Sequence, residues 1–267
     1  MKVSASIVAY KTHIFKKNLL GIVESSANKF FLIDNSPTDD LKVLATDSKI
    51  EYIHNPSNPG FGAAHNIAIQ KAIDSGSKYH FIINPDIYFD NDVINPMVNY
   101  MERNPDVGMM MPKVLNEDGS IQYLPKLLPN PFWIFRRKFK KPENAYKEFL
   151  NKYELRNVAE DKIYNTPILS GCFTLLNLEA IREVGMYDDR FFMYFEDFDL
   201  SRRMHQKYKT IYFPEVSVYH GYEGGASKSW RLFKIFIKSM LTYFNKWGWF
   251  LDKDRKIINR RTLDQFK

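Results

Sequence analysis

Cysteine is nearly absent from this sequence, which has one, Cys172, in 267 residues. A single cysteine excludes an intramolecular disulfide and fits a reducing compartment such as the cytoplasm. The first ten residues, MKVSASIVAY, lack the longer apolar run and small-residue cleavage site of a signal peptide, and we expect a strand there. No window of about 18 uninterrupted apolar residues occurs, so the sequence predicts no membrane-spanning helix.

Several nucleotide-binding and nucleic-acid-binding signatures are also missing. Neither GxGxxG nor GxxxxGK[ST] occurs, which removes the main support for a Rossmann dehydrogenase or a P-loop NTPase. After the first predicted strand stands Tyr10-Lys11-Thr12-His13, where a nucleotidyltransferase needs a glycine-rich, basic signature. RNA-recognition and zinc-binding spacings are absent, so we expect no nucleic acid partner, although the net charge is +7. That charge favours other acidic partners, such as nucleotide diphosphates and anionic lipid.

Apolar residues, by contrast, make up 45% of the chain and can form a sizeable core. Short apolar runs alternate with segments of helical spacing, which predicts a parallel sheet with helices on its faces. The predicted strands are Val3–Ala9, Phe30–Ile33, Ile50–Ile53, Tyr79–Ile83 and Ile168–Leu176, with a further one at Val216–Tyr219. The predicted helices are Phe15–Ala27, Ala63–Ser75 and Glu179–Val184. Residues 115–165 are less regular, and we expect a long, partly mobile lid with some helix there.

Two aspartates stand where predicted strands end. Asp34 follows Phe30–Ile33, and Asp86 closes Asn84-Pro85-Asp86 after Tyr79–Ile83. Ligands of such sheets bind at the carboxyl ends of the strands. A carboxylate at Asp86 could ligate a hard divalent cation that bridges diphosphate oxygens. The alternative is a simple turn, because Asn, Pro and Asp all favour turns.

The densest chemistry lies in Glu196-Asp197-Phe198-Asp199, after the aromatic run Phe191–Phe195. If a helix begins here, its dipole stabilises these acids in the first turn, and an ionised carboxylate among aromatics can act as a general base. The alternative is an N-terminal cap paired with Arg202 or Arg203. From the residues alone, the two interpretations are equally supported.

Two further segments could contribute to a site. Residues 58–66 read NPGFGAAHN, a glycine-containing turn into a helix that ends at Asn66. His220 follows the strand Val216–Tyr219. A lone histidine is more often structural than a ligand, but its place beyond a strand end favours a role in binding.

Taken in order, these motifs resemble the family 2 inverting glycosyltransferases, in particular bacterial rhamnosyltransferases of cell-surface polysaccharide synthesis. The matching segments span most of residues 3–229 and are SIVAY, LIDNSPTDD, NPSNPGFGAAHNIAI, FIINPDIYF, LSGCFTLLNLEAIREVGMYDDRFFMYFEDFDLSRRM and VYHGYEGGASKS. The resemblance implies a GT-A fold, in which a Rossmann-like, mostly parallel sheet is flanked by helices. It also implies transfer of a sugar, L-rhamnose from dTDP-rhamnose as first choice, with galactofuranose, glucose and N-acetylglucosamine open.

The same resemblance implies roles for single residues. Asp197 matches the catalytic base, and Glu196 would orient the acceptor, a glycan or lipid-linked oligosaccharide. Asp86 matches the last acid of the DxD motif, a ligand of Mg²⁺ or Mn²⁺, and His220 a histidine that completes the metal site in some relatives. Asn84 replaces the first acid of that motif, so the metal affinity could be weak. Four positions match contacts to the nucleotide of a dTDP- or UDP-sugar donor: Ala9, Tyr10, Asp34 and Asn66.

The C-terminal part differs from the rest. We assign residues 1–227 to the catalytic domain and 228–267 to a basic, aromatic helical extension. On a helical wheel Lys228, Arg231, Lys234, Lys238 and Lys246 share one face, and aromatic and aliphatic side chains cover most of the remainder. Such a helix suits an anionic membrane surface, which predicts peripheral binding at the inner face of the cell membrane. The alternatives are packing on the catalytic domain or on a second subunit in a homodimer. A catalytically inactive scaffold of the same fold is the rival to the enzyme.

Overall fold

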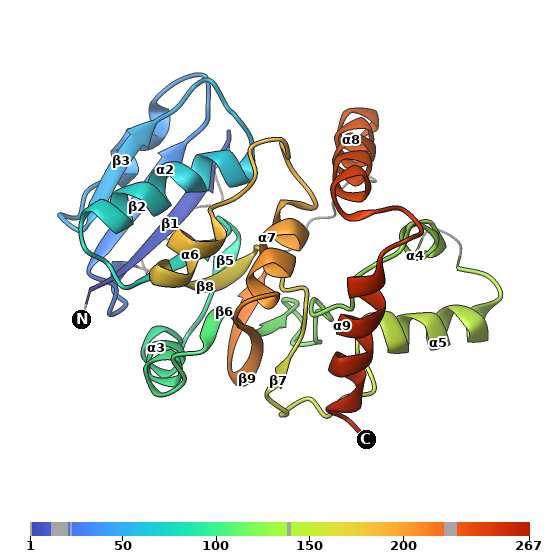
Figure 1. Cartoon of the computed structure of the whole chain (residues 1–267). Coiled ribbons are helices and arrows are strands. Elements are labelled where there is room, and N and C mark those ends of the chain that lie inside the picture. Colours follow the sequence, from blue (N-terminus) through green and yellow to red (C-terminus); the bar gives the residue numbers. More distant parts are fainter. Residues whose placement is uncertain (1, 12–20, 22, 138–139, 222–228) are drawn as a thin grey trace.

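The computed structural model describes residues 2–11, 21, 23–137, 140–221 and 229–267. Within these ranges the strands form one mixed sheet, with helices in front of it and further helices gathered beyond its edge (Figure 1). The α/β architecture predicted from the sequence is therefore confirmed. Most of the predicted helix Phe15–Ala27 lies outside the described residues.

Buried apolar segments form the strands of the sheet. Their order is β3-β2-β1-β4-β8-β6-β9-β5, and β7 pairs with β9. Strands β1, β2, β3 and β4 run parallel, β8 is antiparallel to β4 and β6, and β9 is parallel to β6. The bounds are β1 Val3–Ala9, β2 Lys29–Asp34, β3 Ile50–His54, β4 Tyr79–Ile83, β5 Ile87–Tyr88, β6 Val107–Leu115, β7 Tyr164–Asn165, β8 Phe173–Asn177 and β9 Lys209–His220.

Several helices begin at a side chain that caps their first N–H groups, and two end at a glycine. The side chains of Asn130, Asn177, Ser229 and Asp252 cap the first N–H groups of α4, α6, α8 and α9. Gly185 and Gly248 end α6 and α8 with positive φ. The bounds are η1 Asp40–Leu44, α2 Phe61–Asp74, α3 Ile94–Arg103, α4 Pro131–Arg136, α5 Glu143–Tyr153, α6 Leu178–Val184, α7 Glu196–His205, α8 Trp230–Trp247 and α9 Lys253–Asp264.

The predicted strand Ile168–Leu176 is too long at its start, because β8 begins at Phe173. Ser201 Oγ in α7 donates to the carbonyl of Leu169 at 3.1 Å and accepts its N–H at 3.2 Å. The backbone of Leu169 is therefore bonded to α7. Residues 115–165 contain α4, α5 and β7 between irregular stretches, as the prediction of a loop with some helix requires.

Three clusters of buried apolar residues stabilise the described part of the chain, the smallest being Leu128, Ile168 and Ile258. The largest one surrounds the sheet. The second, which we call the α8 cluster, joins α4 and α8 to the segment before α7 and consists of Ile134, Phe191, Phe195, Met240, Tyr243 and Phe244. The C-terminal helix α8 thus packs on the catalytic unit, which was one alternative for this segment. Among the described residues, no helix is both long enough and apolar enough to cross a bilayer.

Candidate active site

The topology brings the predicted site residues to one edge of the sheet. Ala9 and Asp34 end the parallel strands β1 and β2, and β4 ends just before Asn84. Strand β8 runs the other way and starts at this edge, where Phe173 pairs with Ile83. Strand β9 ends there as well, at His220 beside Ile87. Carboxyl ends of strands are the usual ligand-binding edge of such sheets.

Asp34 is fully buried at the end of β2. One carboxylate oxygen accepts the N–H of Ser36 at 2.9 Å, and the other accepts the hydroxyl of Tyr52 at 2.7 Å. Burial and this hydrogen bond raise the pKa of Tyr52, which therefore remains a neutral donor. Next to Asp34, the carbonyl of Ala9 accepts the N–H of Asn35 at 2.9 Å, and Tyr10 is exposed. Ala9, Tyr10 and Asp34 therefore lie together at the ligand-binding edge of the sheet, and their roles in nucleotide binding stay predictions.

Asn66 lies in α2, and its amide is bonded to the loop that follows α6. Its Nδ2 donates to the carbonyl of Tyr187 and to Asp189, each at 2.9 Å. Its Oδ1 accepts the N–H of Tyr187 at 3.0 Å. These contacts position the loop before α7, so nucleotide binding by Asn66 remains a prediction without support from the geometry.

Asp86 and His220 face each other where β4 and β9 end. Nε2 of His220 lies 3.3 Å from Oδ1 of Asp86, and that oxygen is buried and accepts no hydrogen bond from the described residues. The orientation and the proton position of the His220 ring follow from its contacts with Gln122. Its amide nitrogen donates to the carbonyl of His220 at 3.0 Å and to Asn116 at 2.8 Å, so its oxygen accepts from Nδ1 of His220 at 2.9 Å.

This hydrogen-bond network assigns the proton of a neutral His220 to Nδ1. A lone pair on Nε2 then lies 3.4 Å from the amide nitrogen of Asn84 and 3.3 Å from a carboxylate oxygen of Asp86, and these two acceptors could share a cation. Oxygen and imidazole nitrogen are both ligands of Mn²⁺, and Mg²⁺ prefers oxygen. The two residues therefore fit a divalent ion as a partial ligand set. Among the described residues, no group of three or more His, Cys, Asp or Glu side chains could hold a metal, so Asp86 and His220 alone would leave further ligand positions of such an ion open.

Glu196 and Asp197 begin α7, as predicted. Asp197 Oδ2 accepts the N–H of Gly171 at 3.3 Å, and Oδ1 accepts the N–H of Phe198 at 2.9 Å. The neighbouring Cys172 accepts the N–H of Asn84 through its carbonyl at 2.8 Å, which links the two acidic parts of the site through a two-residue backbone segment.

The two carboxyl groups titrate differently. Burial, followed by the charge of Asp197, raises the pKa of Glu196 well above its ordinary value, and Oε2 of Glu196 is buried without a hydrogen bond from the described residues. Burial also raises the pKa of Asp197, while the N–H groups of Gly171 and Phe198 and the Lys126 ammonium counteract this rise. Glu196 therefore holds a proton more tightly, and Asp197 is the ionised member of the pair.

Backbone strain precedes this pair. Tyr194 and Phe195 adopt positive φ, 70° and 64°, which aromatic side chains rarely do. Such residues cluster at functional sites, where surrounding contacts determine them. Gly60 has a φ of 108°, and a Cβ there would lie 2.2 Å from the carbonyl oxygen of Phe192. The N–H of Phe61 donates to that carbonyl at 2.8 Å, so the start of α2 supports the loop before α7.

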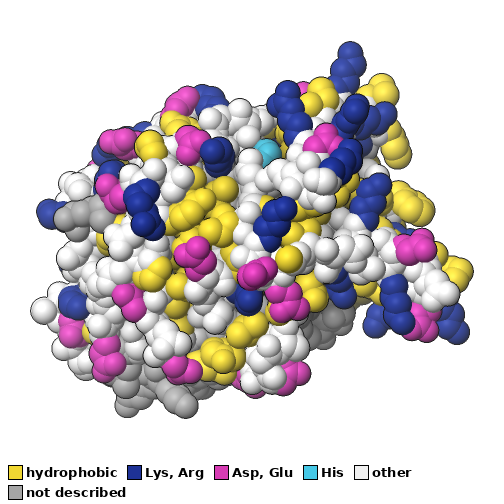
Figure 2. Space-filling view, turned by 90° about the horizontal axis from the view of Figure 1, so that it is seen from below, with side chains coloured by type: hydrophobic (Ala, Val, Ile, Leu, Met, Phe, Trp, Pro, Cys, Tyr) yellow, Lys and Arg dark blue, Asp and Glu magenta, His cyan; other side chains and the backbone are white. Residues whose placement is uncertain are grey.

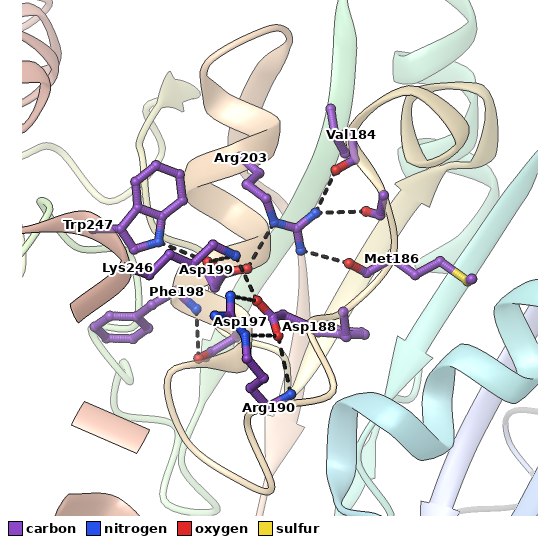
Figure 3. A network of polar contacts seen from close by, with 12 residues as sticks. Val184, Met186, Asp188, Arg190, Asp197, Phe198, Asp199, Arg203, Lys246 and Trp247 are labelled. Carbon is purple, nitrogen blue, oxygen red and sulfur yellow. Dashed lines mark hydrogen bonds and ion pairs between the residues drawn. The ribbon is translucent and has the colours of Figure 1, made fainter. Parts of the chain in front are cut away.

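The third acid, Asp199, is fully buried and has a different environment. It accepts from Arg203 Nε at 2.8 Å, from Trp247 Nε1 at 2.8 Å and from Lys246 Nζ at 2.7 Å (Figure 3). The alternative of an N-terminal cap is therefore wrong, because the N-cap residue is Phe195 and no side chain of the described residues caps α7, but one acid of this turn, Asp199, does pair with Arg203. Arg202 pairs with Asp252.

Several residues of the site were not predicted from the sequence. Tyr52 holds Asp34, Gln122 orients His220, and Gly171 donates to Asp197. Lys126 is buried, donates to the carbonyls of Tyr123 and Leu124, and burial lowers its pKa to about 8. Of these only Tyr52 carried a signal, since it stands near the end of a predicted strand.

Comparison with known proteins agrees with this geometry. The sequence model of the family described as Glycosyl transferase family 2 matches residues 4–185. The N-acetylglucosaminyl-diphospho-decaprenol L-rhamnosyltransferase of Mycobacterium tuberculosis is 26% identical over 211 residues, which cover 71% of this chain. This chain spans only 65% of the length of that relative.

Two solved structures share the fold. GalNAc-T7 with UDP, GalNAc and Mn²⁺ superposes with a TM-score of 0.62 at 15% identity, over 83% of this chain and 43% of that one. The mannosyltransferase PcManGT from Pyrobaculum calidifontis, with GDP-Man and Mn²⁺, gives 0.61 at 15% identity, over 91% of this chain and 64% of its own. The GT-A fold predicted from the motifs is confirmed.

Proposed function

The chain belongs to glycosyltransferase family 2, as its motifs predicted, and on this premise we propose that it transfers a sugar from a nucleotide-sugar donor to an acceptor hydroxyl with inversion. The observation that carries the proposal is the pair at the start of α7. Asp197 is half-buried and fixed by two N–H groups that counteract the rise of its pKa, while burial raises the pKa of Glu196 beside it well above its ordinary value.

In the proposed reaction Asp197 accepts the proton of the acceptor hydroxyl, while the oxygen of that hydroxyl bonds to the anomeric carbon of the donor sugar. The bond from that carbon to the diphosphate oxygen breaks at the same time, and the nucleoside diphosphate leaves with the electron pair. Asp86 and His220 would hold Mg²⁺ or Mn²⁺, which neutralises charge on the departing diphosphate. Ala9, Tyr10 and Asp34 would bind the base and ribose, and Glu196 would orient the acceptor.

For the donor we propose dTDP-rhamnose, and for the acceptor a lipid-linked or cell-surface glycan. The M. tuberculosis relative supports the sugar and the acceptor class, because it is named as an L-rhamnosyltransferase of N-acetylglucosaminyl-diphospho-decaprenol. UDP-linked galactofuranose, glucose and N-acetylglucosamine are the other donors to compare.

We further propose peripheral contact with an anionic membrane at the inner face of the cell membrane. Hydrophobic and basic side chains alternate along the side of the molecule where α4, α5, α8 and α9 lie (Figures 1 and 2). Exposed apolar side chains there, which we call the outer surface, are Phe132, Phe135, Trp230, Leu241, Phe250 and Leu251, with Arg231, Lys234 and Lys238 among them. Aromatic rings interleaved with lysine and arginine suit such a surface.

The test of the proposed reaction is a donor panel measured with and without Mn²⁺. We expect one nucleotide sugar to be turned over with metal present. Asp197→Asn should lower kcat by about 10²- to 10⁴-fold, because the base is lost, with an unchanged Kd for the nucleoside diphosphate. Asp254→Asn, an exposed aspartate of α9, is the matched control and should retain activity. A chain that binds no nucleotide sugar with metal present would instead be a scaffold.

A further inference from the structure

Helix α8 contacts the strained backbone directly before the proposed base. The hydroxyl of Ser239 donates to the carbonyl of Met193 at 2.8 Å, and Ser239 is buried. Met193 immediately precedes Tyr194 and Phe195, the two residues with positive φ. A left-handed conformation is unfavourable for residues with side chains, so it persists only where surrounding contacts determine it.

Aromatic side chains of α8 provide a second set of contacts to the same residues. The ring of Phe195 lies 5.4 Å from Phe236 and 5.4 Å from Tyr243, measured between centroids. The ring of Tyr194 lies 5.8 Å from Phe236. Phe195 is the N-cap residue of α7, so α8 packs directly on the position that sets the direction of Glu196 and Asp197.

The last turn of α8 binds the same helix start from another side. Lys246 Nζ lies 2.7 Å from Asp199 and 2.8 Å from Asp188, which joins α7 to the loop that precedes it (Figure 3). Trp247 donates its indole N–H to Asp199 at 2.8 Å. The helical wheel groups Lys246 with the basic residues expected at a membrane surface, but its ammonium turns inward to the half-buried Asp188 and the buried Asp199.

The link continues beyond α8. Arg202, in the second turn of α7, is buried and forms two parallel hydrogen bonds to Asp252, each at 2.8 Å. Its guanidinium also lies 4.2 Å from the ring centroid of Trp247. Paired geometry of this kind fixes both partners in orientation. The C-terminal segment from α8 to the start of α9 therefore binds the first and second turns of α7.

From these contacts we infer that α8 is a positioning element of the active site, in which Ser239 holds the segment Met193–Phe195, Lys246 joins Asp188 to Asp199, and both thereby orient Asp197 toward the acceptor hydroxyl. The inference rests on the proposed function. It assigns a catalytic purpose to a helix that lies outside the residues matched by the family model, 4–185.

The test uses the full chain with Ser239→Ala, Lys246→Met and Lys246→Arg, and the donor found in the panel. We expect Ser239→Ala and Lys246→Met to lower kcat by about 10- to 100-fold, because small misplacement of a catalytic group has effects of this size. The Kd of the nucleoside diphosphate should not change. Lys246→Arg, which keeps a cation between Asp188 and Asp199, should recover most of the activity.

The acid limb of the kcat profile distinguishes positioning from a merely structural role. A looser turn admits water to Asp197, which lowers its pKa and moves the acid limb to lower pH. Lys256→Met, an exposed lysine of α9, is the control. If Ser239→Ala and Lys246→Met lower Tm but match this control in kcat and acid limb, the inference is overturned. If Asp197→Asn retains transfer, the proposed function fails first, and the two failures are distinguishable.

Discussion

Three acids within four residues take three different roles at the start of α7. Asp199 is buried among Arg203, Lys246 and Trp247. Asp197 is stabilised by N–H groups and faces the site, and Glu196 is buried next to it without a hydrogen bond from the described residues. The environment decides the role of each carboxylate, although all three lie in one turn of one helix.

The first prediction concerns Glu196 and pH. The folded chain binds the proton of Glu196 more tightly than the unfolded chain, because its pKa is raised. The stability that this proton provides is present at low pH and is lost as pH rises above the ordinary value of 4.5. Glu196→Gln, which mimics the protonated acid, should raise the free energy of unfolding at pH 7 by about 1 kcal/mol and flatten its dependence on pH. Urea unfolding between pH 5 and 8 measures both.

The same pKa direction predicts the pH dependence of activity. Asp197 must be ionised to accept a proton, and burial raises its pKa, so kcat should fall on acidification at a pH above the ordinary aspartate value of 3.8. In Glu196→Gln this acid limb should stay at the same pH, because the raised pKa of Glu196 keeps it protonated and uncharged over that range, and burial is what raises the pKa of Asp197. An acid limb that moves to lower pH in Glu196→Gln would show instead that Glu196 is ionised beside Asp197.

The sequence predicts the place of a residue where the order of strands determines it. Asp34, Asp86 and His220 lie at one edge, as expected, because strands that end there bring these residues together, and their roles stay predictions. Gln122 and Ser239 were not found, because their partners stand 98 and 46 residues away and depend on packing. The sequence around a serine in an amphipathic helix does not predict which distant carbonyl its hydroxyl will bind.

At the scale of elements, the start of α2 and the loop before α7 fit together only with glycine at position 60. Gly60→Ala would place a Cβ against Phe192 and adopt a φ that side chains rarely allow. We expect a loss of about 3 kcal/mol in stability together with lower kcat. Gly76→Ala is the matched control, because Gly76 also has positive φ but its Cβ would meet nothing within 4 Å. It should cost about 1 kcal/mol, with kcat unchanged, as thermal unfolding and donor turnover would show.

Element boundaries followed the hydrophobic pattern where a strand or helix packs on the sheet. Strands β1 and β4 have the predicted bounds, and α2 begins two residues before the predicted start. The predicted strand boundary is wrong where a backbone group bonds to a helix instead of a neighbouring strand, as at Leu169. The helical wheel also gives no sign of an ion pair on the inner side of an amphipathic helix, as at Lys246. Periodicity reports which face is apolar, but not which partner covers it.

For the whole molecule, the outer surface predicts binding to anionic vesicles. The chain should float with vesicles containing phosphatidylglycerol and not with phosphatidylcholine alone. Each basic side chain near such a surface contributes about 1 kcal/mol, so Arg231→Gln with Lys234→Gln should weaken partitioning about 30-fold. Replacing Trp230 and Leu251 by serine should weaken it further, since they are 70% and 97% exposed.

Val43→Ser is the control for surface hydrophobicity, because Val43 is 74% exposed on η1, outside the outer surface. Equal flotation of all variants would contradict membrane contact through the outer surface. Point substitutions are preferable to deletion of residues 228–267. Such a deletion would uncover the α8 cluster and remove the contacts of Ser239 and Lys246, so lost binding and lost folding would be confounded.

The attachment of α8 and α9 to α7 also bears on how this protein can exchange parts with its relatives. Residues 186–205 contact the C-terminal helices through matched side chains, Asp188 and Asp199 with Lys246, and Arg202 with Asp252. Their contacts with earlier residues include backbone groups, as at Phe192 and Gly171, and apolar packing of Tyr187, Leu200 and Met204 in the main core, but no ion pair with the part of residues 2–185 that the structure describes. A recombination junction near residue 185 would therefore preserve the matched pairs, whereas one at residue 227 would separate them. The last third of the chain is inherited most safely as one block.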